Sequence, residues 1–179
     1  MTRQMKAAVF AGNGIVNIKD VPVPQITRPD DVIIKVKACG ICGSDLHVLS
    51  VPPGQYAEPG TILGHEFTGI VEAVGPEVTS VKAGDKVVAE PNVRCGICPE
   101  CRRGNFNLCR NAVNTGQHRD GAFAQYCRMP EKQLYLVPQN MPDHLAALAE
   151  PLACVMNGMQ RINPRPSEKV IVFGAGAIG

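Results

Sequence analysis

Four of the eight cysteines stand in one short window, at a spacing that suits a metal ion. They follow the pattern C-x2-C-x2-C-x7-C, at Cys95, Cys98, Cys101 and Cys109. Four thiolates can close a tetrahedral zinc site, which leaves no position for a substrate. The surplus negative charge can be balanced by the neighbouring arginines Arg94, Arg102, Arg103 and Arg110. The pattern therefore predicts a structural zinc site. An iron–sulfur cluster is the main alternative, and DNA binding is disfavoured because no recognition-helix pattern follows.

A second group of residues could hold a metal ion that keeps an open coordination position. Cys42 opens the segment CGSDLH (42–47), and His65 and Glu66 stand in the segment GHE (64–66). A thiolate, an imidazole and a carboxylate suit a catalytic zinc, which retains one position for water or substrate. Each piece alone is weak evidence, since a lone cysteine is more often a small buried hydrophobe. Their occurrence together, ahead of the four-cysteine window, favours the metal site.

A glycine pattern near the end of the sequence is typical of dinucleotide binding. Gly174, Gly176 and Gly179 form G-x-G-x-x-G after the apolar run 169–173, which we expect to be a strand. Such glycines allow a tight turn and a close approach of a pyrophosphate to a helix N-terminus. The acidic residue that would distinguish NAD from NADP is expected about 20 residues further on, beyond residue 179. The cofactor is therefore left as NAD or NADP.

The elements that must position these groups are mostly short strands. Apolar or alternating runs occur at 6–10, 15–19, 32–38, 69–74, 85–89 and 122–129, with glycine and proline turns between them. This pattern favours a barrel or a sandwich, and 51–59 is expected to be a loop. Residues 143–149 favour a helix by propensity, and apolar residues recur at helical spacing over 152–162. Pro151 should break or restart this helix, and Asn163-Pro164 should end it.

Composition excludes several classes of protein. The chain has 179 residues, 45% hydrophobic and 19% charged, with a net charge of +2, which is ordinary for one globular domain or one domain plus part of another. This charge gives no general reason to bind nucleic acid or a membrane. No apolar run approaches the roughly 20 residues of a membrane span, and the N-terminus has no readable secretory signal. Clustered cysteines without such a signal indicate metal ligands in a reducing, cytoplasmic compartment.

The motifs together resemble the zinc-dependent medium-chain alcohol and polyol dehydrogenases, closest to the sorbitol/iditol branch. The matching segments, in the family's order, are GICGSDLH (40–47), GHEFTGIVEAVG (64–75), AGDKVVAEPNVRCGICPECRRGNFNLC (83–109), DGAFAQYC (120–127), EPLACVMNG (150–158) and VIVFGAGAIG (170–179). The resemblance implies a mainly β fold with some α. It comprises a GroES-like catalytic domain over 1–150, with the structural zinc lobe at about 90–112. A linking helix and the first strand of a truncated Rossmann domain follow over 151–179.

The resemblance also implies a role for several individual residues. Cys42 and His65 match the first two ligands of the catalytic zinc, and Glu66 matches a carboxylate that binds the metal directly or exchanges with water. Glu150 matches the further ligand of the polyol branch, often acting through water. The alcohol dehydrogenase branch has a cysteine at that position, so Cys154, four residues later, is the alternative.

Three further residues match groups that handle protons or orient a ligand. Asp45 matches a carboxylate that orients the ligand histidine, which fixes the ring tautomer. Ser44 and His47 match a proton relay, and histidine has a suitable pKa for the exit end of such a relay.

The implied activity is hydride transfer from a secondary alcohol of a polyol, sugar alcohol or sugar acid to NAD or NADP. Two zinc ions per chain, a small-molecule substrate and a homodimer or homotetramer are expected of the full-length protein. We expect this chain to be an N-terminal fragment that is inactive by itself. The alternative is a non-enzymatic zinc domain on a GroES-like barrel, acting as a redox or interaction module with Cys42 and His65 empty. A zinc-free quinone reductase relative is disfavoured, because that branch usually lacks both sets of metal ligands.

Overall fold

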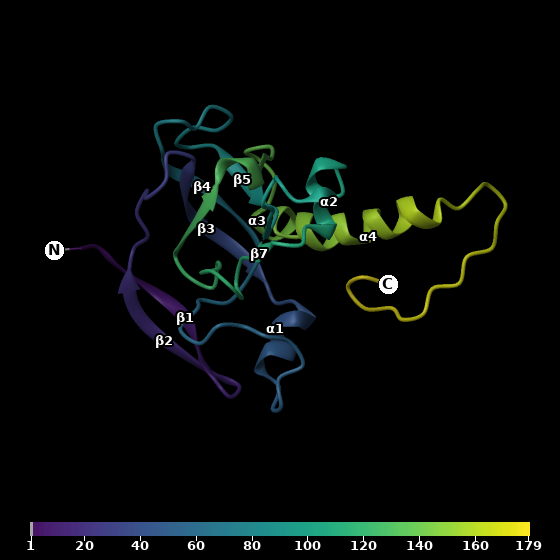
Figure 1. The fold of residues 1–179 in the computed structure, drawn as a ribbon, viewed down its shortest axis with the longest axis horizontal. Helices are drawn as coiled ribbons and strands as arrows, with labels where there is room; N and C mark the ends of the chain where they lie inside the picture. The colour runs from purple at the N-terminus through teal and green to yellow at the C-terminus, as the bar shows by residue number, and fades with distance from the viewer. Residues whose placement is uncertain (1) are drawn as a thin grey trace.

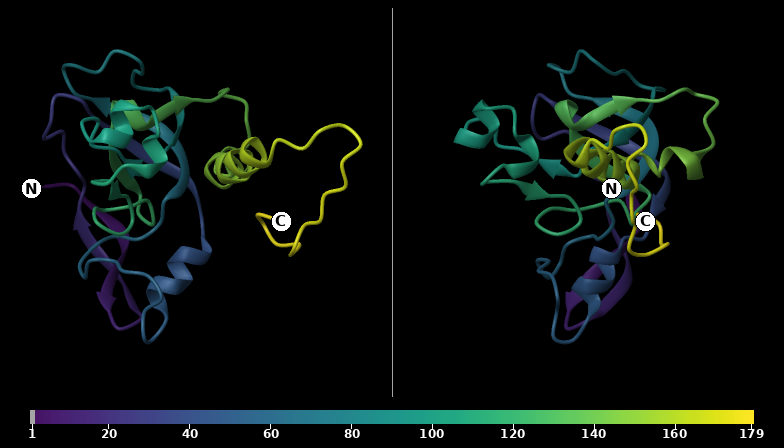
Figure 2. Two further views of the ribbon diagram at one scale, coloured as in Figure 1. Left: turned by 45° about the vertical axis from the view of Figure 1, so that its right-hand side comes forward. Right: turned by 90° about the vertical axis from the view of Figure 1, so that its right-hand side faces the viewer.

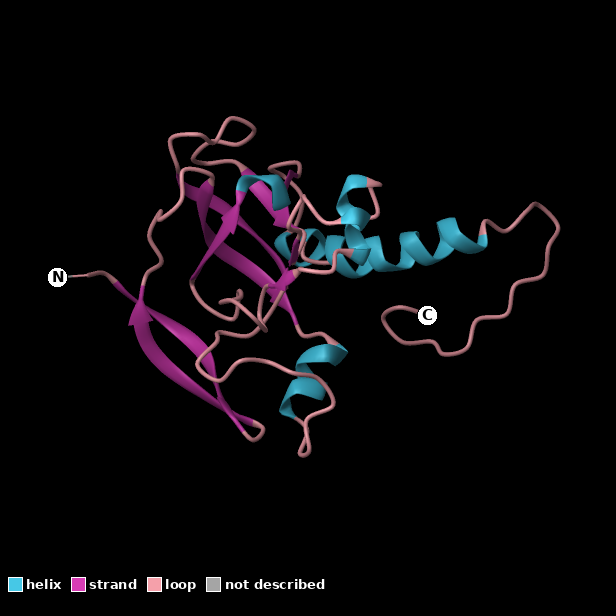
Figure 3. Ribbon diagram, viewed as in Figure 1, coloured by secondary structure: helices cyan, strands magenta, loops and turns pink. Residues whose placement is uncertain are grey.

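A five-stranded antiparallel sheet forms the centre of the computed structural model, which describes residues 2–179 (Figures 1 and 3). Its strand order is β8-β3-β4-β5-β9. The strands are β3 (Asp31–Gly40), β4 (Glu66–Val74), β5 (Lys86–Ala89), β8 (Tyr126–Pro130) and β9 (Leu134–Leu136). The strands expected at 32–38, 69–74 and 85–89 are confirmed. The strand expected at 122–129 begins only at Tyr126, because residues 122 and 123 donate their backbone N–H groups to Gly64 and Leu63 instead.

A hairpin of β1 (Gln4–Gly12) and β2 (Ile15–Pro22) lies against this sheet, and both strands were expected. Its turn is Gly12-Asn13-Gly14, where all three residues have positive φ, a conformation that glycine and asparagine tolerate. Backbone bridges join Ala7 to Ala124 and Val9 to Ile62, so the hairpin is tied to the segments beside the sheet.

The first half of strand β3 is buried on both faces, and this fixes its position. Val32 and Ile34 face the main core with Phe67 and Val71 of β4. Ile33, which points to the other face, packs with the hairpin residues. Alternation of side chains along a strand allows one strand to serve both cores. Helix α1 (Gly43–Leu49) follows β3 directly and is anchored by the buried Val48 in a third cluster.

The four-cysteine window folds as a small lobe of short elements that stands to one side of the sheet (Figure 2). Its elements are β6 (Asn92–Val93), α2 (Pro99–Arg102), η1 (Phe106–Leu108) and β7 (Val113–Asn114). Strands β6 and β7 pair with each other, and a further turn, η2 (Glu131–Gln133), connects β8 to β9. With little regular structure and few buried side chains of its own, the lobe is a segment that a metal ion would stabilise.

The expected helix near Pro142 consists of two pieces, α3 (Asp143–Ala146) and α4 (Ala149–Ile162). Pro151 lies in the first turn of α4, where a proline costs no intrahelical hydrogen bond. The prediction that Pro151 would break or restart the helix is thus confirmed as a restart. Asn163 ends α4 in the left-handed conformation, as expected of Asn163-Pro164. No helix among the described residues is long and apolar enough to cross a membrane.

The prediction of a strand at 169–173 is wrong. Residues 163–179 form neither helix nor strand, and they extend from the end of α4 (Figure 1). Ile171 is 78% exposed and Phe173 is 94% exposed. A strand forms when a neighbouring strand satisfies its backbone groups and covers its side chains. No such neighbour lies beside this segment in the described chain.

Candidate metal centres

Cys42, His65 and Glu66 meet at the end of the β3–β4 pair. One ligand atom from each lies within 4.8 Å of the other two. The antiparallel register pairs Gly40 with Glu66, so Cys42, just past the end of β3, comes beside His65, just before the start of β4. Ligand atoms that share one tetrahedral zinc ion are about 3.3 to 3.8 Å apart, which lies within the 4.8 Å limit that this cluster meets. The three residues therefore fit a zinc ion both in donor type and in spacing.

Asp45 connects the two protein segments of this cluster. Its carboxylate is buried, with Oδ2 accepting the backbone N–H of Cys42 at 2.9 Å and Oδ1 lying 3.7 Å from Nδ1 of His65. This contact orients the histidine so that its other ring nitrogen, Nε2, is turned away from Asp45. Ser44 Oγ lies 3.5 Å from that Nε2. Asp45 thus occupies the place in which a carboxylate orients a metal-binding histidine.

Glycines hold the turn that carries His65. Gly64 has φ +87°, and a Cβ atom there would penetrate the ring of Phe123. The backbone of Gly121 and the backbone of Gly116 both pack directly against Gly64. Ala122 donates to the Gly64 carbonyl at 2.9 Å. No local sequence pattern identifies these glycines as positioning residues, because Gly116 and Gly121 become neighbours of Gly64 only in the folded chain.

Helix α4 brings Glu150 and Cys154 toward the same cluster. Burial raises the pKa of the Glu150 carboxyl, and the nearby His65 lowers it to a smaller extent. The Cys154 thiol donates to Oε1 of Glu150 at 3.6 Å, and burial followed by the charge of Glu150 raises its pKa. Glu150 is not among the mutually close donor atoms of the cluster. Its place as a further ligand, and the choice between Glu150 and Cys154, stay predictions.

The remaining residues predicted for catalysis or cofactor binding lie outside the cluster. His47 is exposed on α1, and no hydrogen bond joins it to Ser44 within residues 2–179. Gly174, Gly176 and Gly179 are exposed in the irregular C-terminal segment. The relay and the dinucleotide pattern therefore stay predictions.

The four cysteines of the lobe form the second cluster. Their sulfur atoms all lie within 4.8 Å of one another, and Cys98 and Cys101 are buried. Cys95 and Cys109 are in direct contact, with 3.6 Å between their sulfurs. The backbone N–H groups of Ile97 and Cys98 point at Cys95 and lower the pKa of its thiol to about 6. Burial raises the pKa of the Cys101 thiol to about 12, so that proton would be released only on metal binding. Four sulfurs this closely spaced fit a closed Zn²⁺ site.

The arginines around the lobe are engaged largely with carboxylates. Arg94 lies over the ring of Phe106 at 4.0 Å and pairs with Glu90 at 3.2 Å. Arg103 and Arg110 both approach Oε1 of Glu100, at 3.0 and 3.6 Å. The Arg94–Glu90 pair thus links the lobe to the residue after β5, and the Glu100 contacts join parts of the lobe to one another.

Comparison with known proteins shows the family to which the chain belongs. Residues 28–139 match the family described as "Alcohol dehydrogenase GroES-like domain". The chain is 42% identical to D-altritol 5-dehydrogenase of Agrobacterium fabrum, over 98% of this chain and 52% of that protein. It is 39% identical to sorbitol dehydrogenase of Bacillus subtilis, over 99% of this chain and 51% of that protein. The chain thus spans about half the length of these relatives.

Solved structures show the same fold. Galactitol-1-phosphate dehydrogenase from Escherichia coli superposes with a TM-score of 0.90 at 35% identity, covering 97% of this chain and 50% of that one. A zinc-binding dehydrogenase from Sinorhizobium meliloti, solved with NADP, superposes with a TM-score of 0.84 at 40% identity, covering 89% of this chain and 46% of that one. By its sequence and by its fold, the chain belongs to the alcohol dehydrogenase GroES-like domain family.

Proposed function

We propose that the chain is the metal-binding part of a zinc-dependent dehydrogenase that oxidises a secondary alcohol of a polyol or sugar-derived substrate with NAD or NADP. The observation that carries this proposal is the cluster of Cys42, His65 and Glu66, whose donor atoms converge within 4.8 Å. The relatives support the substrate class, since altritol, sorbitol and galactitol 1-phosphate dehydrogenases all act on polyols by name. We also propose a dimer or tetramer in the cytoplasm, a compartment suited to eight free cysteines.

Cys42 and His65 would hold the catalytic zinc, with Glu66 as the third donor and Glu150 as a further ligand, directly or through water. When bound, zinc supplies a Lewis acid that lowers the pKa of a substrate hydroxyl. Asp45 keeps the His65 ring in one orientation and ties it to the Cys42 backbone. The structural zinc would be held by the four cysteines of the lobe, Cys95, Cys98, Cys101 and Cys109.

Ser44 and His47 would carry the proton away from the substrate. Ser44 Oγ lies 3.5 Å from Nε2 of His65, the nitrogen that would bind the metal, so it is placed to accept a hydroxyl proton there. His47 follows three residues later on the same short helix and is exposed, so it can exchange a proton with solvent. A proton can pass from Ser44 to His47 only when a hydroxyl group or a water molecule bridges the two side chains.

The division into a domain over 1–150 and a linking segment over 151–179 belongs to the same proposal. Helix α4 has no buried residue, so it is suited to leading from one domain into the next. Gly174, Gly176 and Gly179 would cradle the pyrophosphate of the nicotinamide cofactor once neighbouring strands order the segment.

Metal analysis of the purified chain tests the proposal. We expect two zinc ions per chain, one of which exchanges readily for Co²⁺ and gives visible absorption bands that shift on addition of sorbitol. One bound zinc, with the Cys42 thiol open to a thiol reagent and with no Co²⁺ bound beside His65, would instead support a non-enzymatic zinc domain.

A further inference from the structure

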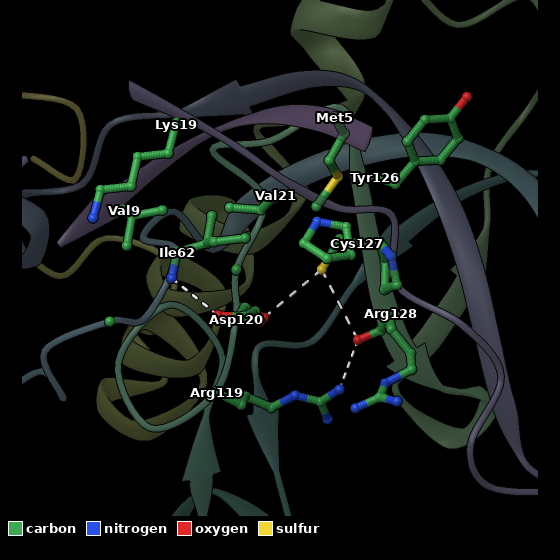
Figure 4. Close-up of a pocket in the computed structure, with 14 residues that line it drawn as sticks. Met5, Val9, Lys19, Val21, Ile62, Arg119, Asp120, Tyr126, Cys127 and Arg128 are labelled. Atoms are coloured by element: carbon green, nitrogen blue, oxygen red, sulfur yellow. Dashed lines mark hydrogen bonds between the residues drawn. The ribbon is translucent and has the colours of Figure 1, made fainter. Parts of the chain in front are cut away.

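A cavity of about 590 Å³ lies beneath the β1–β2 hairpin, and none of its lining residues belongs to either candidate metal cluster (Figure 4). Its volume is within the range of small-molecule sites, about 300–1,000 Å³. It is enclosed by the hairpin on one side and by Ile62 and the start of β8 on the other.

One wall of the cavity is apolar. Met5 and Val9 of β1 face it together with Val21 of β2, Ile62 and Tyr126. All except Val21 are buried, and all five belong to the cluster that packs the hairpin onto the sheet. This wall offers contact to an aliphatic or aromatic body but no hydrogen-bonding side chain apart from the Tyr126 hydroxyl, which contacts Arg3.

The other end of the cavity holds a cation whose donors are largely unused. The Arg119 guanidinium donates once, from Nη2 to the Arg128 carbonyl at 2.6 Å (Figure 4). A guanidinium has five N–H donors, and no carboxylate of residues 2–179 lies within 4.0 Å of this one. Burial lowers the pKa of Arg119, which is the signature of a charge removed from water. The charges of Asp31 and Asp120 offset part of this effect from beyond 4.0 Å. An anion in direct contact with the guanidinium would offset the rest of the cost of burying it.

The neighbouring charged groups indicate how much negative charge the cavity accepts. The charge of Arg128 is balanced by Asp31, which lies 3.8 Å from Nη1, and the same nitrogen donates to Gln25 and Thr27. Asp120 uses Oδ1 to accept the Ile62 backbone N–H at 3.0 Å, and its own charge disfavours a second negative charge on the same wall. Lys19, exposed at the rim, adds a positive charge at the entrance. The balance favours an anion of one negative charge.

We propose that this cavity binds a small organic monoanion, a carboxylate on an apolar body. The carboxylate would accept hydrogen bonds from Arg119, since the guanidinium fork matches two carboxylate oxygens. The apolar body would lie against Met5, Val9 and Ile62. This proposal is independent of the metal sites.

Calorimetric titration of the chain with octanoate tests the site, with octanamide as the uncharged probe of equal length. We expect Arg119→Gln to weaken octanoate binding about 10- to 100-fold, the effect of losing a charged hydrogen-bond partner. Octanamide should bind the unaltered chain correspondingly weakly. Arg161→Gln, which removes an exposed arginine on α4, is the matched control and should bind octanoate normally. Val21→Phe fills the cavity from a half-buried position and leaves Arg119 in place, so it should also abolish octanoate binding. This variant tests the site if Arg119→Gln does not fold.

Three results would overturn the proposal. These are no octanoate binding by the unaltered chain at millimolar concentration, equal affinity for octanoate and octanamide, or equal binding by the Arg119→Gln and Arg161→Gln variants. Cys42→Ser distinguishes a carboxylate bound at the metal cluster. If this variant no longer binds octanoate, the carboxylate binds at the metal cluster and the cavity site is rejected. If it still binds octanoate, the cavity site is supported.

Discussion

Gly40 and Glu66 are paired across the end of β3 and β4, and the Glu66 side chain occupies the space that a Cβ atom on Gly40 would fill. Such an atom would lie 3.2 Å from Cβ of Glu66 and would overlap its carboxylate. The missing side chain at Gly40 therefore makes room for the Glu66 carboxylate beside Cys42 and His65.

Gly40→Ala should displace the Glu66 carboxylate and weaken Co²⁺ binding at this cluster about tenfold, an effect typical of groups that support metal ligands. Gly43→Ala is the control, because a Cβ atom at Gly43 would meet nothing within 4 Å although the residue adjoins Cys42. Competition with a chromophoric chelator measures both affinities. Equal affinities in the two variants would show that Glu66 does not need the space at Gly40.

The two clusters should lose their metal ions separately. Cys101→Ser removes one of the four thiolates of the lobe. If each thiolate contributes about a quarter of a zinc-binding free energy of about 10–16 kcal/mol, zinc affinity there should fall on the order of 100-fold. The melting temperature should fall by roughly 6–12 °C. Cys42→Ser should remove the other zinc while far-ultraviolet circular dichroism is unchanged. Zinc analysis after gel filtration measures both, and loss of both ions from either variant would contradict separate roles.

Glu150 and Cys154 can be distinguished as ligands by substitution. If Glu150 completes the catalytic cluster, Glu150→Gln should weaken Co²⁺ binding about tenfold, whereas Cys154→Ser should change it less than about twofold. With zinc kept in the lobe and Co²⁺ in this cluster alone, the thiolate-to-Co²⁺ charge-transfer band should then arise from Cys42. A band that loses intensity in Cys154→Ser would assign the ligand to Cys154 instead.

Asp31 should make stability depend on pH in the acid range. Burial opposes ionisation of this carboxyl, but the backbone N–H groups of Thr27 and Arg28 more than offset it, at 3.0 and 2.8 Å, and its pKa is lowered. Because the pKa is lower in the folded chain, Asp31 stabilises the fold above the ordinary aspartate pKa. This contribution is lost as the pH falls through the lowered value.

Asp31→Asn should therefore lower the free energy of unfolding by about 1–3 kcal/mol at neutral pH, with a smaller difference from the unaltered chain below about pH 4. Urea unfolding at several pH values measures the difference. Asp20→Asn serves as the control, since Asp20 pairs with Lys6 at an exposed position where ion pairs contribute little. A cost for Asp31→Asn that does not change with pH would reject the ionised carboxylate as its source.

Much of the site follows from local sequence. The steps of two residues between Cys95, Cys98 and Cys101 place their sulfurs together through short turns, whatever the rest of the chain does. Period-two runs such as 32–38 predict strands because alternate side chains must reach a core. The residue types at Cys42, His65 and Glu66 indicated a metal site before any fold was known.

The amino-acid sequence alone thus determined which side chains could bind metal and which runs could become strands, because these depend on chemistry and on near neighbours in the chain. Only the tertiary structure decided that Gly40 makes room for Glu66 and that Gly116 and Gly121 hold Gly64. It also placed Arg119 at a cavity with no carboxylate of residues 2–179 within 4.0 Å of its guanidinium. It also left 169–173 without strand structure despite its apolar residues. These outcomes depend on atoms far apart in sequence, and no local pattern specifies whether such neighbours are present.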